Sequence, residues 1–266
     1  MNTADRLPIE PVAAEPVAAL PRARATAVGP DTAGLTRQRA VNRAAGELRR
    51  GTPVLLLGAM PLVLLPAETA GARGLAEFAA LAAGPTVLLL APARAAAVLR
   101  RPAMGDAVVA LRTTPALMSP ELLLGLADPT APQMVRDPPQ LAPDCPALAP
   151  AALALAKLAR LLPAVLVAPV IADALVKAEA LGLIAVSAEA VLDYPMESAL
   201  ALRRVAEVPV PLEGAPDARI VAFRAPDAGI EHMAILVGRP EDAAARGEAP
   251  LVRVHSECFT DRKSVV

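Results

Sequence analysis

Aromatic side chains and an excess of either charge are both lacking in this sequence. Aromatic residues make up 2% of the 266 residues, and tryptophan is absent. Proteins that bind single-stranded nucleic acid stack bases on aromatic rings, and proteins that bind duplexes present a basic face. Here 26 lysine and arginine residues are balanced by 27 aspartate and glutamate residues. The composition therefore argues against a nucleic-acid partner and predicts a core of aliphatic side chains.

Cysteine is also scarce, because Cys145 and Cys258 are the two in the chain. Two cysteines so far apart do not make a disulfide framework. The N-terminal residues lack the unbroken apolar core of a signal peptide, since Asp5, Glu10 and Glu15 fall among them. We therefore expect a reducing, cytoplasmic setting.

Long apolar runs without proline are missing as well. The charge-free stretches 51–67 and 78–93 approach the roughly 20 residues that span a bilayer. Five prolines interrupt them: Pro53, Pro61, Pro66, Pro85 and Pro92. Such punctuation is typical of short buried strands joined by turns, so we expect no membrane partner.

The order of the apolar segments predicts an α+β protein of two domains. Residues 1–30 are rich in proline without a steady period and are expected to form a disordered tail. Residues 31–200 alternate helical and strand-length apolar segments, which is typical of an α/β or α+β layer arrangement with strands buried on both faces. Helices are expected at about 31–50, 72–82, 93–99, 151–161 and 174–180, and from a Ser187 cap towards Tyr194. Strands are expected at 54–57, 62–65, 86–90 and 165–167.

The texture of the sequence changes beyond the first domain's proline-rich connection at 128–150. Short runs rich in valine and isoleucine are separated by turn residues after residue 200. They lie at 205–210, 219–223, 233–237 and 251–254. Strands spaced in this way favour an antiparallel meander, within a second domain at 201–260.

The last of these runs carries the most concentrated set of reactive side chains. If it forms a strand whose valines face the core, Arg253, His255 and Glu257 share the other face. An arginine fork suits phosphate, a glutamate accepts from a purine edge or a ribose hydroxyl, and the Cys258 thiolate suits zinc. The alternative is a half-exposed strand with a solvated charged face. One cysteine does not hold a catalytic zinc ion, which normally needs three protein ligands.

The stretch Pro250-Leu-Val-Arg-Val-His-Ser-Glu-Cys-Phe-Thr260 resembles the opening motif of GTP cyclohydrolase II, the enzyme that starts riboflavin biosynthesis. The stretches 203–211, 218–223 and 231–238 are similar to that family's leading strands, in order and spacing. The resemblance implies that Cys258 is the first zinc ligand. It also implies a GTP site lined by five consecutive residues: Arg253, Val254, His255, Ser256 and Glu257.

The sequence departs from that family after Thr260. The family's two further zinc cysteines do not appear, and residues 261–266 read Asp-Arg-Lys-Ser-Val-Val. We therefore expect a truncated cyclohydrolase domain, an unrelated tail at 261–266, and a fragment without activity and with no catalytic residue of its own. For the full-length form the resemblance implies a homodimer that hydrolyses GTP to a diaminopyrimidinone ribosyl phosphate. Zinc would assist the release of formate, and magnesium the release of pyrophosphate.

Two segments of the first domain resemble dihydroxybutanone phosphate synthase. Residues 48–55 are similar to the start of that domain and residues 184–194 to its end. That enzyme holds magnesium with an acidic loop, whereas the matching stretch 56–66 has no carboxylate. Glu68 follows, and a turn or helix-start role is the better interpretation. We therefore predict a degenerate, non-catalytic synthase-like domain of the α/β type; the alternative to the enzyme hypothesis is a small-molecule-binding or dimerisation module.

Three other features carry weaker predictions. His232 beside Glu231 suggests a ligand pair, but a histidine entering an apolar strand is more often structural. Cys145 is expected to be an ordinary thiol. The glycines at 71 and 74 lack the spacing of a phosphate-binding loop.

Overall fold

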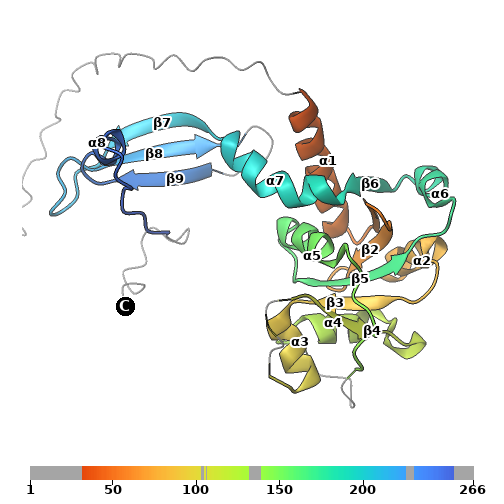
Figure 1. The fold of residues 1–266 in the computed structure, drawn as a ribbon. Coiled ribbons are helices and arrows are strands. Elements are labelled where there is room, and N and C mark those ends of the chain that lie inside the picture. The colour runs from red at the N-terminus through yellow and green to blue at the C-terminus, as the bar shows by residue number, and fades with distance from the viewer. Residues whose placement is uncertain (1–31, 103–104, 106, 132–138, 226–230, 255–266) are drawn as a thin grey trace, which may run out of the picture. The chain divides into compact units, whose positions relative to one another are not determined.

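The computed structural model describes residues 32–102, 105, 107–131, 139–225 and 231–254. In this part of the chain the strands form two separate sheets, of six and three strands (Figure 1). The predicted tails at 1–30 and 261–266 lie outside the described residues. So do His255, Ser256, Glu257 and Cys258 of the predicted site.

The six-stranded sheet is mixed and has the order β4-β3-β5-β2-β1-β6. β1 and β6 are parallel, and the other neighbouring strands are antiparallel. Its strands are β1 (Val54–Leu57), β2 (Leu62–Pro66), β3 (Val87–Leu90), β4 (Val109–Arg112), β5 (Ala164–Pro169) and β6 (Ile184–Ser187). Its helices are α1 (Thr32–Arg49), α2 (Ala72–Leu81), α3 (Pro92–Leu99), α4 (Pro120–Ala127), α5 (Ala149–Leu158), α6 (Ala174–Ala180) and α7 (Ala188–Leu200), with a 3₁₀ turn, η1, at Pro115–Leu117.

Helices cover both faces of this sheet, which explains its unbroken apolar strands. Successive side chains of a strand point to opposite faces. In β1, Leu56 joins a core cluster with α1, α5 and α7, whereas Leu55 joins another with α2, α3, α4 and α6. Both residues are at most 1% exposed. The predicted layer arrangement with strands buried on both faces is therefore confirmed, and the mostly antiparallel pairing favours the α+β alternative.

Local sequence accounts for most of these elements. α1, α2, α3, α5 and α6 lie where helical periodicity predicts them, and β1 to β3 and β5 where the apolar runs predict them. Ser187 caps α7 as expected, since its Oγ accepts from the Ala190 N–H at 3.4 Å. The helix does not stop near Tyr194 but continues through Pro195 to Leu200.

Gly51 ends the turn after α1 in a conformation that requires glycine. Its φ is +74°, in the left-handed region that disfavours residues with a Cβ. A Cβ there would also lie 2.3 Å from the Thr69 carbonyl oxygen. The turn at Gly51 is therefore packed tightly against the segment that leads into α2.

The three-stranded sheet is an antiparallel meander in the order β7-β8-β9. Its strands are β7 (Arg203–Pro209), β8 (Arg219–Arg224) and β9 (Glu231–Leu236), followed by α8 (Pro240–Ala245). This confirms three of the four strands predicted there, and with them the α+β class. The division into domains at 200/201 stays a prediction.

The fourth strand predicted for the meander is wrong. Residues 251–254 are in neither helix nor strand. A strand with one buried face would place Val252 and Val254 against a core, but they are 77% and 93% exposed. Alternation of apolar and polar residues produces a buried face only where a neighbouring strand supplies backbone partners, and the described residues supply none here.

Candidate functional site

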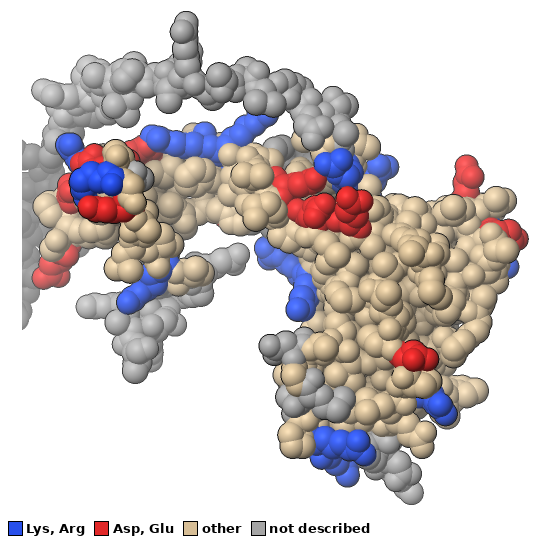
Figure 2. All heavy atoms as spheres, viewed as in Figure 1, with Lys and Arg blue, Asp and Glu red and all other residues tan. Residues whose placement is uncertain are grey.

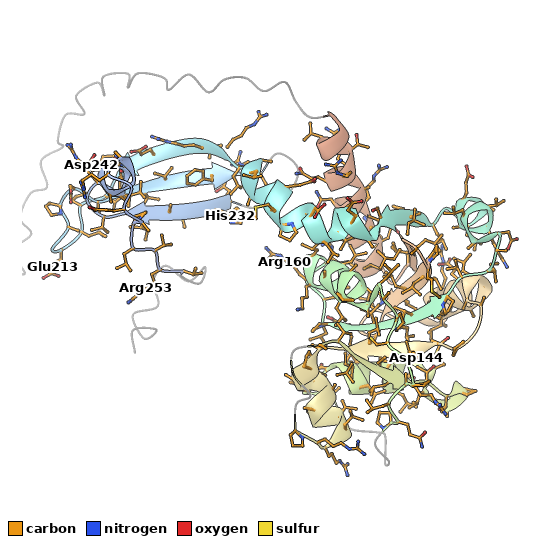
Figure 3. The ribbon with its side chains drawn as sticks, viewed as in Figure 1. Asp144, Arg160, Glu213, His232, Asp242 and Arg253 are labelled. Carbon is orange, nitrogen blue, oxygen red and sulfur yellow. The ribbon has the colours of Figure 1, made fainter. Side chains whose placement is uncertain are left out.

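The predicted GTP site is described for two of its five residues. Arg253 and Val254 lie in the extended segment after α8, and both are exposed. Figure 3 shows Arg253 in this segment and His232 on β9. The guanidinium of Arg253 is available to an anion, because an exposed arginine keeps its five donors and its charge.

One face of the meander carries a cluster of charged side chains. A β-bulge between Arg204 and Ala206 shifts the register, so that Arg204 and Glu207 pair with Phe223 and Val221 on the same face. Arg204 forms an ion pair with Glu207. Basic and acidic side chains mix over β7–β9 and α8 in the space-filling view (Figure 2).

Arg219 on β8 joins this face to α8. Its Nε lies 3.5 Å from Oε1 of Glu207, which makes an ion pair without hydrogen-bond geometry. Its Nη2 donates to Glu241 in the first turn of α8. This hydrogen bond lowers the pKa of the Glu241 carboxyl below its ordinary value. These charged groups are already paired with one another, so the cluster holds the strand face and α8 together.

The opposite face of the meander is exposed and mostly apolar, with the Arg224–Glu231 ion pair at one end. Val208, Ile220 and Ile235 lie side by side across the three strands, and Ala222 and Met233 form the next pair. Met233 is 60%, Val208 54% and Ile235 46% exposed.

Metal ligands do not gather in the described part of the chain. No group of three or more histidine, cysteine, aspartate or glutamate side chains there could hold a metal ion. Cys145 is exposed, and its thiol lies 3.7 Å from the Val108 carbonyl oxygen. Partial burial raises the pKa of this thiol. These properties agree with the ordinary thiol predicted for Cys145.

His232 and Glu231 do not act as a pair in the described structure. They are successive residues of β9, so their side chains leave opposite faces of the sheet. Glu231 forms an ion pair with Arg224 on the neighbouring strand. His232 is exposed and lies opposite Phe223.

The connection between β1 and β2 is apolar, as the sequence predicts. It runs from Gly58 to Pro61 through Met60, whose side chain is 68% exposed. Glu68 lies in the turn after β2, and its Oε2 accepts from the Leu162 N–H at 2.6 Å. The turn role expected for Glu68 is confirmed, and no carboxylate lines the β1–β2 connection itself.

Comparison with known proteins relates the meander to a sequence family. The sequence model of the GTP cyclohydrolase II family matches residues 203–262, which contain the meander and the predicted site. Residues 203–262 are therefore similar in sequence to the GTP cyclohydrolase II family. A GTP cyclohydrolase-2 from Azospirillum brasilense is 37% identical over 239 residues. That alignment covers 84% of this chain and 58% of the relative, so the chain spans little more than half of the relative's length.

Solved structures with similarity to the chain include dihydroxybutanone phosphate synthases. A two-domain 3,4-dihydroxy-2-butanone 4-phosphate synthase from A. baumannii has a TM-score of 0.46 and 17% identity, and covers 76% of this chain and 71% of its own. A synthase from Candida albicans also has a TM-score of 0.46, with 16% identity, and covers 58% of this chain and 96% of its own.

The ionic cluster around Arg219 could not be predicted from the sequence. Its members are separated by up to 37 residues and come from β7, β8 and α8. The one local indication was the pair of opposite charges at Arg204 and Glu207, and a regular strand would have put these two residues on opposite faces.

In the described residues no helix is long and apolar enough to cross a membrane.

Proposed function

We propose that residues 203–262 supply the opening part of a GTP cyclohydrolase II catalytic domain. The family match over this segment carries the proposal, because it spans both the antiparallel meander and the motif that follows it. In this proposal GTP is the substrate, and the products are a diaminopyrimidinone ribosyl phosphate, formate and pyrophosphate. The protein acts in the cytoplasm as a homodimer in its full-length form.

Each residue of the motif has a proposed role in GTP binding that follows from its side-chain chemistry. Arg253 offers a planar fork to the triphosphate. His255 and Ser256 donate or accept hydrogen bonds, Glu257 accepts from the guanine edge or the ribose, and Val254 contributes backbone contacts. The exposure of Arg253 in the described structure supports a role in first contact with the anionic substrate.

Zinc, when bound, would supply a hydroxide at neutral pH, and magnesium would help the release of pyrophosphate. Cys258 is the proposed first zinc ligand. The residues present do not fit a three-cysteine zinc site, because Cys145 and Cys258 are the two cysteines of the 266 residues. No reaction step is therefore assigned through the metal, and the 266-residue chain alone is proposed to be inactive.

A side-by-side assay tests this proposal. The 266-residue chain is compared with a longer product, in which the reading frame is extended to include the family's two further zinc cysteines as a Cys-x-Cys pair. Both are assayed for zinc content and for formate release from GTP. The longer product is expected to hold zinc in stoichiometric amount and to release formate, while the 266-residue chain does neither. Cys258→Ser in the longer product should abolish both. Formate release or stoichiometric zinc in the 266-residue chain would falsify the proposal of inactivity.

The first domain is proposed to be a non-catalytic relative of dihydroxybutanone phosphate synthase that serves packing or assembly. The apolar β1–β2 connection supports this, since magnesium in proteins is held by oxygen ligands and this connection offers no side-chain oxygen. Incubation of the chain with the substrate of the synthase and magnesium should give no 3,4-dihydroxy-2-butanone 4-phosphate. Formation of this product would instead establish an active synthase.

The second candidate function is a binding or dimerisation module with no cyclohydrolase role. The first domain favours this second function, because its sheet has a hydrophobic core on each face and such a domain can be stable by itself. If the longer product also lacks formate release, this second candidate replaces the first.

A further inference from the structure

A pocket of about 130 Å³ lies where the end of α1 meets the beginning of α2. Its lining includes Arg50 and Thr52, in the turn after α1. It also includes Arg73 and Glu77 of α2, with Thr69 and Gly71 in the segment that leads into α2. None of these residues belongs to the motif proposed to bind GTP.

Two close contacts hold together the segments that line this pocket. The Thr69 hydroxyl donates to the Leu48 carbonyl oxygen at 2.7 Å. A Cβ on Gly74 would lie 2.2 Å from the Gly51 carbonyl oxygen. These contacts bring the turn after α1 and the first turn of α2 together at a fixed separation. Arg50 and Arg73 therefore lie on two segments, the turn after α1 and the first turn of α2, that are packed directly against each other.

The charge of the lining is positive. Arg50 and Arg73 contribute two positive charges, and Glu77 is the one carboxylate among the lining residues. Arg50 pairs with Glu47 at 3.1 Å and Arg73 with Glu77 at 2.7 Å. Both arginine side chains are largely exposed, at 70% and 86%. Exposed ion pairs of this kind contribute little stability, so both guanidinium groups can turn to a ligand at small cost.

Backbone donors add to the two guanidinium groups. α2 begins after Gly71 with no side-chain cap, and the N–H groups of its first turn have no partner within the helix. A Cβ placed on Gly71 would meet nothing within 4 Å, so the backbone there is open to a ligand. Two arginines with backbone N–H groups form a donor set that suits the oxygens of a phosphate group.

We propose that this pocket binds a phosphate group, either as the free ion or as the phosphate of a small monoester. The site differs from a glycine-rich phosphate loop, because arginines from two separate segments supply its charge. It is also independent of the proposed GTP site, so either proposal can fail without the other.

Titration of the full chain with inorganic phosphate at constant ionic strength tests the site. The backbone amide resonances of Thr52, Gly71 and Gly74 are expected to shift together and to saturate at millimolar phosphate. A parallel titration with glycerol 2-phosphate separates the two sources. Tighter binding of the monoester assigns the pocket to a phosphorylated metabolite, and tighter binding of the inorganic ion assigns it to free phosphate.

Three charge variants and a matched control sharpen the test. Arg50→Gln and Arg73→Gln should each weaken binding by about three- to tenfold, because each removes a charge-assisted contact. Glu77→Gln should strengthen binding by about twofold, because it releases Arg73 and removes the competing carboxylate. Arg43→Gln, on an exposed part of α1 outside the pocket lining, removes the same charge and should leave affinity within about twofold.

Equal weakening by Arg43→Gln and Arg50→Gln would overturn the proposal, because it would show general attraction to a basic helix. Shifts that do not saturate, or that spread along α1 without reaching Gly71 and Gly74, would overturn it as well. Circular dichroism of each variant establishes that the fold is retained before its affinity is compared.

Discussion

The carboxylate of Glu68 accepts a hydrogen bond from the backbone N–H of Leu162, with 2.6 Å between the two atoms. It thereby joins the turn after β2 to the residues just before β5, 94 positions further along the chain. The first carboxylate after the apolar strands β1 and β2 is thus a structural acceptor in this domain.

Replacement of Glu68 by alanine is expected to lower the free energy of unfolding by about 1 kcal/mol, the usual contribution of such a hydrogen bond at a solvated site. Glu68→Gln should cost less, because the amide oxygen can still accept. Urea denaturation with and without millimolar magnesium measures both effects. Stabilisation of the wild type by magnesium that Glu68→Gln abolishes would contradict the structural role and point to a metal ligand.

Arg94 on α3 should be a larger contributor to stability. Its guanidinium donates to the carbonyl oxygens of Leu126 at 2.7 Å, Gly125 at 2.8 Å and Asp128 at 3.1 Å, at the end of α4. Helix C-terminal carbonyls lack partners within the helix, so Arg94→Met leaves three acceptors without this donor. We expect a loss of about 2 kcal/mol in urea denaturation. Arg101→Met, at an exposed position, is the control and should change stability by less than about 0.5 kcal/mol.

Gly51 and Gly84 form a matched pair that separates backbone strain from steric overlap. Both have positive φ, at +74° and +87°, but an added Cβ meets the Thr69 carbonyl oxygen at Gly51 and nothing within 4 Å at Gly84. Gly84→Ala should cost about 1–2 kcal/mol, from left-handed strain alone. Gly51→Ala should cost at least about 3 kcal/mol in thermal or urea unfolding. Equal losses at the two positions would show that the turn at Gly51 relaxes freely.

The Arg219–Glu241 pair predicts a pH-dependent attachment of α8 to the meander. The pKa of Glu241 is lowered in the folded state, chiefly by its hydrogen bond from Arg219. Its stabilising contribution is therefore present above the ordinary pKa of 4.5 and is lost as pH falls through the lower folded-state value. Hydrogen exchange of the α8 and β8 amides should be faster in Arg219→Met than in the wild type at neutral pH. The difference should shrink in acid; a difference that is constant with pH would exclude a role for this ionisation.

The exposed apolar face of the meander predicts self-association. Val208, Ile235 and Met233 lie close together on this face and are about half exposed. Large exposed apolar patches favour association with other surfaces. Gel filtration of the chain should therefore show species beyond a dimer that increase with concentration.

The double variant Met233→Lys and Ile235→Lys should reduce these species several-fold by placing charges in the patch. Val176→Lys, at a 70% exposed position on α6, is the matched control and should not. A single monomer or dimer peak from the wild type would contradict the prediction.

The positions of most helices and strands in the first domain follow from local sequence, whereas its polar contacts do not. The apolar runs at 54–57 and 62–65 lie almost where β1 and β2 do, because a strand covered on both faces needs no polar residues. β4 was not predicted: its four residues end in Arg112, and its pairing with β3 defines it. The hydrogen bond between Glu68 and Leu162 could not be predicted either, because no residue near Glu68 in the sequence indicates a partner 94 positions away.

The predicted site shows the same division. The motif at 250–260 was sufficient to place the chain with GTP cyclohydrolase II, and the family match at 203–262 confirms that resemblance. Its alternating pattern also predicted a strand at 251–254, which was wrong because a strand requires hydrogen-bonding neighbours as well as a suitable pattern. The roles of Arg253 to Cys258 in binding remain a prediction.

The sequence by itself determined which segments of the first domain are buried, roughly where α1, α2, α3, α5 and α6 lie, and which family residues 203–262 resemble, because these depend on side-chain types at short spacing. Only the tertiary structure decided the strand order, the partner of Glu68, the β-bulge that brings Arg204 and Glu207 to one face, and the arginine pocket between α1 and α2. Each of these joins residues distant in sequence or alters a local register. Their energies come from contacts that exist only once the chain has folded.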